Sequence, residues 1–219
     1  MAASATTSSF HRSHPHIDSK CERRVVDART MKREKMSKKD VVVLVGSLRQ
    51  ASINLKLARA MQKVAPDALN LDILPIGDLP LYNQDLETET PPPAWSSFRE
   101  RIKASDGVIF VTPEYNRSVP AALKNAIEVG SRPYGKSVWE HKPGAVTGAS
   151  PGLIGGAAAA LQLRVILTNI NVPTLPQPEV YLSTADKLVG DNGTFLNEGT
   201  QKFIESFLAA FEVWLARFK

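Results

Sequence analysis

A loop rich in anion-binding groups, GSLRQASIN, follows the first apolar run of the chain and spans residues 46–54. Ser47 and Ser52 supply hydroxyls, and the segment after them is predicted to be helical. Arg49 supplies a guanidinium and Asn54 a carboxamide, close to the free N–H groups of the helix N-terminus. This combination favours a phosphate site, and it is compatible with capping of the helix by Ser52 and Asn54. Neither GxxxxGK[ST] nor GxGxxG is present, which disfavours a nucleoside triphosphatase and a standard dinucleotide fold.

A second polar loop, TPEYNRS, follows another apolar run and spans residues 112–118. A proline, an acid, an aromatic ring and an amide at the carboxyl end of a strand can form one wall of a pocket for a flat ring. Tyr115 would line such a pocket. As composition alone, the same residues are equally typical of an ordinary turn.

A third loop, residues 147–156, matches the nucleophile pattern GxSxG around Ser150. A hydrolase of this type needs a downstream acid and then a histidine, but no histidine follows His141, which we expect to be an exposed loop residue. The glycines instead allow the backbone to approach a ligand ring closely. Since no acid–base constellation emerges, we expect a cofactor to supply the chemistry.

The elements between these loops predict an α/β fold. Apolar or alternating segments predict strands over 41–45, 69–74, 107–111, 144–147 and 172–175. Amphipathic segments predict helices over 54–64, 95–104, 118–129, 154–170 and 201–218, with Gly130 capping the third. Five such units favour a flavodoxin-like three-layer sandwich with a five-stranded parallel sheet in the order 2-1-3-4-5. The three loops then meet at the carboxyl edge of the sheet.

Charge divides the chain into two regions. Residues 1–39 hold 10 Lys/Arg and 4 Asp/Glu, a net charge of +6, whereas residues 40–219 hold 17 and 18, a net charge of −1. We therefore predict a disordered basic tail over 1–39 and one domain over 40–219. The near-neutral domain argues against nucleic-acid binding. The tail is Ser- and Arg-rich, as transit peptides are, but its four acidic residues argue against that function.

Composition also limits the location and the metal chemistry of the protein. No apolar run approaches the ~20 residues that cross a membrane, and no secretory signal is present. The single cysteine, Cys21, cannot form an internal disulfide, and no zinc-binding spacing occurs. The histidines of the tail (His11, His14 and His16) are interpreted as solvated side chains. We expect a cytoplasmic protein without a metal site or a membrane partner.

In this order along the chain, GSLRQASIN, PEYNRSVPAALKNAIE and ASPGLIGG resemble the NADPH-dependent FMN reductase family, in its bacterial quinone/chromate reductase-like branch, over about residues 41–215. The resemblance implies an oxidoreductase that transfers two electrons from NADPH or NADH through FMN to quinones or similar small acceptors of the flavin, azo or chromate type. No catalytic side chain is implied. The implied FMN contacts are Ser47, Leu48, Arg49, Ser52, Ile53, Asn54, Pro113, Glu114, Tyr115, Asn116, Ser150 and Gly152. The chain departs from the family in its long tail and in Pro151, which has no backbone N–H for the flavin.

Two further expectations complete this interpretation. Trp214, Leu215 and Phe218 supply more apolar surface than one face of a terminal helix needs, which, with the resemblance, predicts a homodimer or homotetramer. The alternative function is a flavodoxin-like electron carrier without its own NAD(P)H oxidation, or a flavin-free scaffold. A carrier similar to the flavodoxins would have a hydroxyl-rich T-x-T-G-x-T phosphate loop and an acidic domain. Arg49 in the first loop and the near-neutral charge of the domain argue against this alternative.

Overall fold

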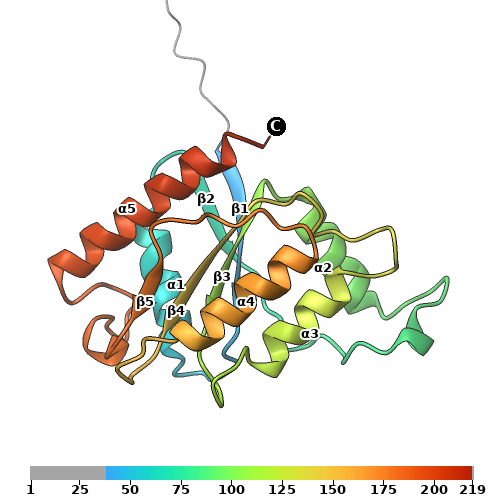
Figure 1. The fold of residues 1–219 in the computed structure, drawn as a ribbon, viewed down its shortest axis with the longest axis horizontal. Helices are drawn as coiled ribbons and strands as arrows, with labels where there is room; N and C mark the ends of the chain where they lie inside the picture. The colour runs from blue at the N-terminus through green and yellow to red at the C-terminus, as the bar shows by residue number, and fades with distance from the viewer. Residues whose placement is uncertain (1–37, 219) are drawn as a thin grey trace, which may run out of the picture. The chain divides into compact units, whose positions relative to one another are not determined.

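The computed structural model describes residues 38–218, so the predicted tail lies almost entirely outside the described residues. The described chain forms one parallel sheet (Figure 1). Its strands are β1 (Lys39–Val45), β2 (Leu69–Ile73), β3 (Gly107–Thr112), β4 (Gly144–Ala149) and β5 (Val180–Leu182). Their order is β2-β1-β3-β4-β5 and all neighbours are parallel, which confirms the flavodoxin-like topology. β1 begins at Lys39, two residues before the predicted start.

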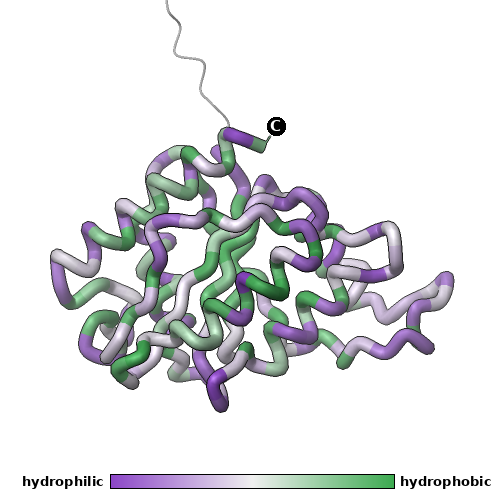
Figure 2. The backbone as a smooth tube through the Cα atoms, in the orientation of Figure 1, coloured by the Kyte–Doolittle hydropathy of each residue, from purple (hydrophilic) through white to green (hydrophobic). Residues whose placement is uncertain are grey.

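Helices cover both faces of the sheet and make the three layers. They are α1 (Ile53–Val64), α2 (Pro93–Ala104), α3 (Ala121–Gly130), α4 (Ala157–Asn169) and α5 (Glu198–Leu215), with short 3₁₀ turns at Gln84–Leu86 and Ala185–Lys187. Alternate residues of β1 face opposite ways: Val41 and Val43 pack with α1 and α5, whereas Val42 packs with α2, α3 and α4. Val41–Val45 of β1 and Val108–Val111 of β3 are accordingly buried and apolar, and the middle of the sheet is largely hydrophobic in Figure 2. Burial on both faces explains these two unbroken apolar runs.

The predicted fifth strand was placed wrongly. In 172–175 only Thr174 forms a bridge, with Gly144, and the Leu175 N–H donates to the Gly144 carbonyl at 2.8 Å. Pro176 follows without an N–H, so the ladder cannot continue there. The chain rejoins β4 at Val180, where β5 pairs with Thr147–Ala149.

Two helices begin later than predicted, and one glycine has a different role. α3 begins at Ala121, because Pro120 is its N-cap, and α4 begins at Ala157, because Gly155 and Gly156 adopt positive φ of 66° and 81°. Gly130 is the last residue of α3 rather than a left-handed cap. A Cβ at Gly130 would lie 2.5 Å from the Trp139 ring, so this glycine is needed for close packing.

Trp214, Leu215 and Phe218 pack within the domain, which corrects their interpretation as surplus surface. Leu215 is buried, and Trp214 packs against the core while its Nε1–H donates to the Pro173 carbonyl at 3.0 Å. Phe218 packs edge-on against Trp214 at a ring-centroid distance of 5.1 Å. In residues 38–218, no helix is long and apolar enough to cross a membrane.

Candidate functional site

Three loops meet at the carboxyl edge of the sheet, at the bottom of the view in Figure 1, and side chains join them. The Tyr115 hydroxyl of the second loop donates to the Ser47 hydroxyl of the first at 3.1 Å. Asn54, at the end of the first loop, donates from its amide nitrogen to the Ala149 carbonyl at 3.1 Å. The three predicted motifs therefore form one site.

The first loop presents free donors around a capped helix. The Ser52 hydroxyl accepts from the Leu55 N–H at 3.2 Å and caps α1, so the capping role of Ser52 is confirmed. Asn54 does not cap the helix: it lies inside α1, and its amide bonds the Ala149 carbonyl instead. From Ser47 to Ala51, no backbone N–H donates to an acceptor within residues 38–218. The Arg49 guanidinium is exposed and has no ion pair with a described carboxylate. These donors, next to the N-terminus of α1, suit an anion such as a phosphate.

Leu48, Ile53 and Asn54 differ in how they contribute to this loop. Leu48 is exposed, whereas Ile53 is half-buried against the core below α1. The Asn54 side chain is buried, and its Oδ1 has no partner among the described residues; the same holds for Thr147 Oγ1 in β4. Buried acceptors without a donor are costly, and their presence at a loop edge is typical of a site that a ligand or water completes.

In the second loop the Glu114 carboxylate binds protein groups rather than facing solvent. Its side chain is 9% exposed, and Oε2 accepts from the Ala158 N–H at 3.0 Å and the Ala159 N–H at 3.4 Å. Oε1 pairs with Arg117 at 3.0 Å. Glu114 thus satisfies the N-terminus of α4, which begins immediately after the third loop. Sequence reasoning missed this contact, since nothing marks residues 44 positions apart as partners.

The rest of the second loop is a tight turn with an exposed tip. Tyr115 and Ser118 exchange backbone hydrogen bonds of 3.2 and 3.0 Å, and Asn116 has a φ of 51° between them. Pro113 is buried at the end of β3, whereas the Tyr115 ring is 43% exposed. A partly exposed aromatic side chain, beside a loop whose N–H groups have no described acceptor, can line a pocket for a flat ligand.

The third loop is compact and carries no hydrolase machinery. Ser150 Oγ accepts from the Gly152 N–H at 3.0 Å. A Cβ at Gly148 would lie 2.9 Å from two loop carbonyls, so the turn requires glycine there. His141 is exposed, as predicted, and lies before β4, at the opposite end of the strand from Ser150. Within residues 38–218 no cluster of metal-binding side chains occurs.

One cavity borders the first loop, and a second lies at the opposite edge of the sheet. One, of about 570 Å³, extends from the first loop along α1 to the end of β2. Another, of about 520 Å³, lies at the amino-terminal edge between Lys103, Lys136 and Lys142. Burial lowers the pKa of Lys142, and its ammonium donates to the Ser105 carbonyl after α2. The second cavity touches none of the three loops and is not part of the site.

A flavodoxin-like sheet with a phosphate-type loop at the β1–β3 switch point defines a flavin-binding class of protein. The sequence model of NADPH-dependent FMN reductases matches residues 40–187, and the chain belongs to this family. A quinone reductase of Pseudomonas putida is 53% identical over 175 residues, 80% of this chain and 94% of the relative. A 2-hydroxy-1,4-benzoquinone reductase of Burkholderia is 41% identical over 80% of this chain and 95% of its own length.

A solved structure agrees with these relatives. FerB, a flavoenzyme NAD(P)H:(acceptor) oxidoreductase from Paracoccus denitrificans, superposes with a TM-score of 0.76 at 42% identity, covering 82% of this chain and 98% of FerB. The cofactor of this chain is therefore FMN, with NAD(P)H as co-substrate. The site fits FMN, because the free N–H groups of the first loop and Arg49 suit its phosphate.

Proposed function

We propose that the protein is an FMN-dependent NAD(P)H oxidoreductase that reduces quinones or similar small acceptors. The observation that carries the proposal is the first loop: its N–H groups, which have no acceptor among residues 38–218, and Arg49 lie at the carboxyl edge of an FMN reductase fold. Relatives named as quinone and 2-hydroxy-1,4-benzoquinone reductases support the acceptor class. Bound FMN supplies the hydride and electron chemistry, so no side chain of the protein has to be a nucleophile.

The protein's own residues bind and orient the flavin. We assign its phosphate to the N–H groups of 47–51, the Ser47 hydroxyl and Arg49, with Ser52 fixing the start of α1. We assign the flat ring to the space between the second and third loops. We assign the border of this space to residues of the two loops, namely Pro113, Tyr115, Asn116, Ser150 and Gly152. Asn54 and Glu114 fix the positions of the loops. Asn54 connects the first loop to the third, and Glu114 connects the second loop to the start of α4.

We also propose that the protein acts in the cytoplasm as a dimer formed through α4. The single cysteine, which leaves no internal disulfide, supports the location. Leu161 and Val165 lie one turn apart on α4 and are 51% and 73% exposed. An exposed apolar strip of this kind is typical of a surface that a second copy covers.

Purification of the full chain tests the function. We expect the absorbance spectrum of bound FMN, oxidation of NADPH or NADH, and dependence of the rate on quinone in a panel of acceptors. Bound FMN without NAD(P)H oxidation would favour the electron carrier, and a colourless protein that does not take up FMN would contradict both functions.

A further inference from the structure

The cavity beside the first loop is large enough for a second ligand group. Its volume of about 570 Å³ lies within the roughly 300–1,000 Å³ that is usual for ligand pockets. It shares Ser47, Leu48 and Arg49 with the phosphate loop, but extends toward β2. Since β2 and β3 lie on opposite sides of β1, the cavity extends away from the second and third loops, where the flavin ring is assigned. It adjoins the proposed FMN site without being occupied by the ring.

The walls of this cavity combine apolar side chains with an arginine that the FMN assignment does not use. Leu55, Ile73 and Leu74 supply the apolar part. Arg59, which is exposed on α1, has no hydrogen bond or ion pair from its side chain to a described residue. Asp72 also lines the cavity, but its carboxylate is paired with Arg101 at 2.8 Å.

One cation of the lining remains for a second ligand. Among the described lining residues Asp78 is the one other carboxylate, and since Arg49 is assigned to the FMN phosphate, Arg59 is the cation that is left for an anion. An arginine fork bonds phosphate oxygens in two places, and an apolar wall accommodates a base. The cavity therefore suits a phosphorylated nucleoside.

We propose that this cavity binds the 2′-phosphoadenosine end of NADPH, with Arg59 contacting the 2′-phosphate, and that it makes NADPH the preferred electron donor. The inference rests on the proposed function, because it assumes that the nicotinamide end reaches the flavin. When the nicotinamide end of an extended dinucleotide lies at the flavin, its adenosine end must bind protein surface next to the flavin site. The cavity at the amino-terminal edge borders none of the three loops and does not meet this requirement.

Steady-state kinetics of the FMN-loaded chain test the assignment. For Arg59→Ala we expect the KM for NADPH to rise about tenfold, equivalent to about 1.4 kcal/mol. The KM for NADH should change by less than about twofold, and kcat and FMN content should stay the same, since Arg59 lies outside the flavin loops. Asp78→Asn should lower the KM for NADPH, because it removes repulsion of the phosphate.

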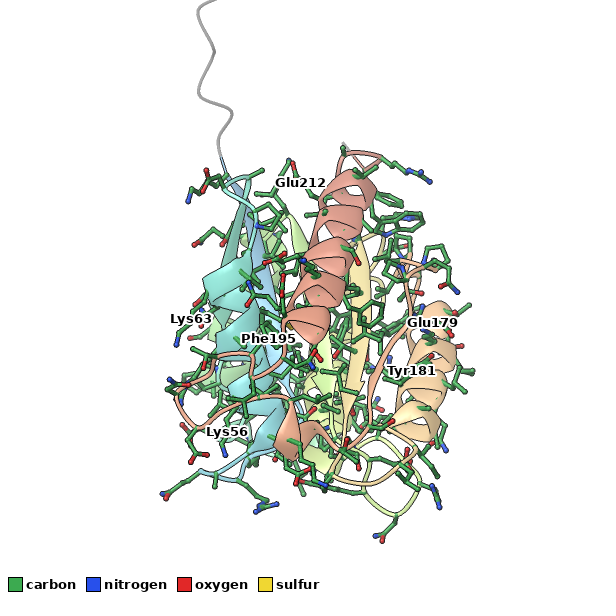
Figure 3. All side chains as sticks on the ribbon, turned by 90° about the vertical axis from the view of Figure 1, so that its left-hand side faces the viewer. Lys56, Lys63, Glu179, Tyr181, Phe195 and Glu212 are labelled. Atoms are coloured by element: carbon green, nitrogen blue, oxygen red, sulfur yellow. The ribbon has the colours of Figure 1, made fainter. Side chains whose placement is uncertain are left out.

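A binding measurement separates this inference from the proposed function. Calorimetry with the oxidised holoenzyme should show tighter binding of adenosine 2′,5′-bisphosphate than of adenosine 5′-monophosphate, and Arg59→Ala should abolish the difference. Lys63→Ala is the matched control, because Lys63 lies one turn further along α1 (labelled in Figure 3) and donates to the Asn192 carbonyl outside the cavity.

Two results would overturn the assignment: equal binding of both adenosine phosphates by the wild type, or equal effects of Arg59→Ala on NADPH and NADH. A protein that fails to oxidise either nicotinamide but still discriminates the two adenosine phosphates would contradict the proposed function and leave the cavity assignment standing.

Discussion

Arg49 and Glu114 bring opposite charges to the same edge of the sheet, but their partners give them different functions. Arg49 is exposed and has no carboxylate partner among the described residues. Glu114 is nearly buried, and its two oxygens bond Arg117 and the first N–H groups of α4. A free cation at a helix N-terminus is available to an anionic ligand, whereas a satisfied carboxylate fixes loop geometry.

Arg49→Ala should weaken FMN affinity by about 1.5–3 kcal/mol, the scale of a charged hydrogen bond. Titration of apoprotein with FMN, followed by quenching of flavin fluorescence, measures the effect. Lys136→Ala removes an exposed cation at the opposite edge and serves as the control. Equal FMN affinity of the wild type and Arg49→Ala would contradict the phosphate assignment.

Glu114→Ala should destabilise the apoprotein by about 1–2 kcal/mol, because it leaves the Ala158 and Ala159 N–H groups without their acceptor. FMN affinity should fall with it, since the second and third loops lose their link. Glu114→Gln keeps an oxygen acceptor and should recover most of both losses. Arg117→Ala removes only the exposed partner and should cost less than about 1 kcal/mol. Denaturant unfolding gives the stabilities, and an unaltered FMN affinity in Glu114→Ala would exclude the positioning role.

Among the elements, those buried on both faces were predictable from the sequence, and those set by long-range contacts were not. Residues 41–45 of β1 and 107–111 of β3 are continuous apolar runs, because helices cover both faces of these strands. β5 is only three residues long, and the apolar segment before it could not form the strand because of Pro176. The three site loops follow from strand ends, but the hydrogen bonds of Glu114 and Asn54 depend on tertiary packing that no local pattern records.

Gly130→Ala tests one of these packing constraints at the end of α3. The new Cβ would lie 2.5 Å from the buried Trp139 ring, whose Nε1–H donates to the Ile127 carbonyl. Because the ring is fixed by this bond and fully buried, we expect a loss of about 1–3 kcal/mol in unfolding free energy, despite the better helix propensity of alanine. Gly77→Ala is the control, since its Cβ would meet only Leu48 at 3.4 Å. If Gly130→Ala were neutral or stabilising in denaturant unfolding, the close contact would be wrong.

For the whole molecule, we expect α4 rather than α5 to form the surface that a second copy covers. α5 packs one apolar face into the core, so Trp214 and Leu215 at its end do not indicate an interface with a second copy. On α4, Leu161 and Val165 remain exposed, and Gln162 between them bonds Ser118 Oγ and the Arg117 carbonyl, both at 2.8 Å. A partner packed on α4 would therefore also contact the second loop and shield the flavin from one side.

Light scattering of the FMN-loaded chain should give twice the 23.9 kDa mass of one chain at micromolar concentration. The double variant Leu161→Glu, Val165→Glu should give a monomer, because two buried carboxylates without partners would oppose the interface. Val213→Glu is the matched control: Val213 is 60% exposed on α5, and its substitution should leave the dimer intact. If Val213→Glu gave a monomer and the double variant stayed dimeric, the interface would lie on α5 and not on α4. A fully active wild-type monomer would show that one chain completes the site by itself.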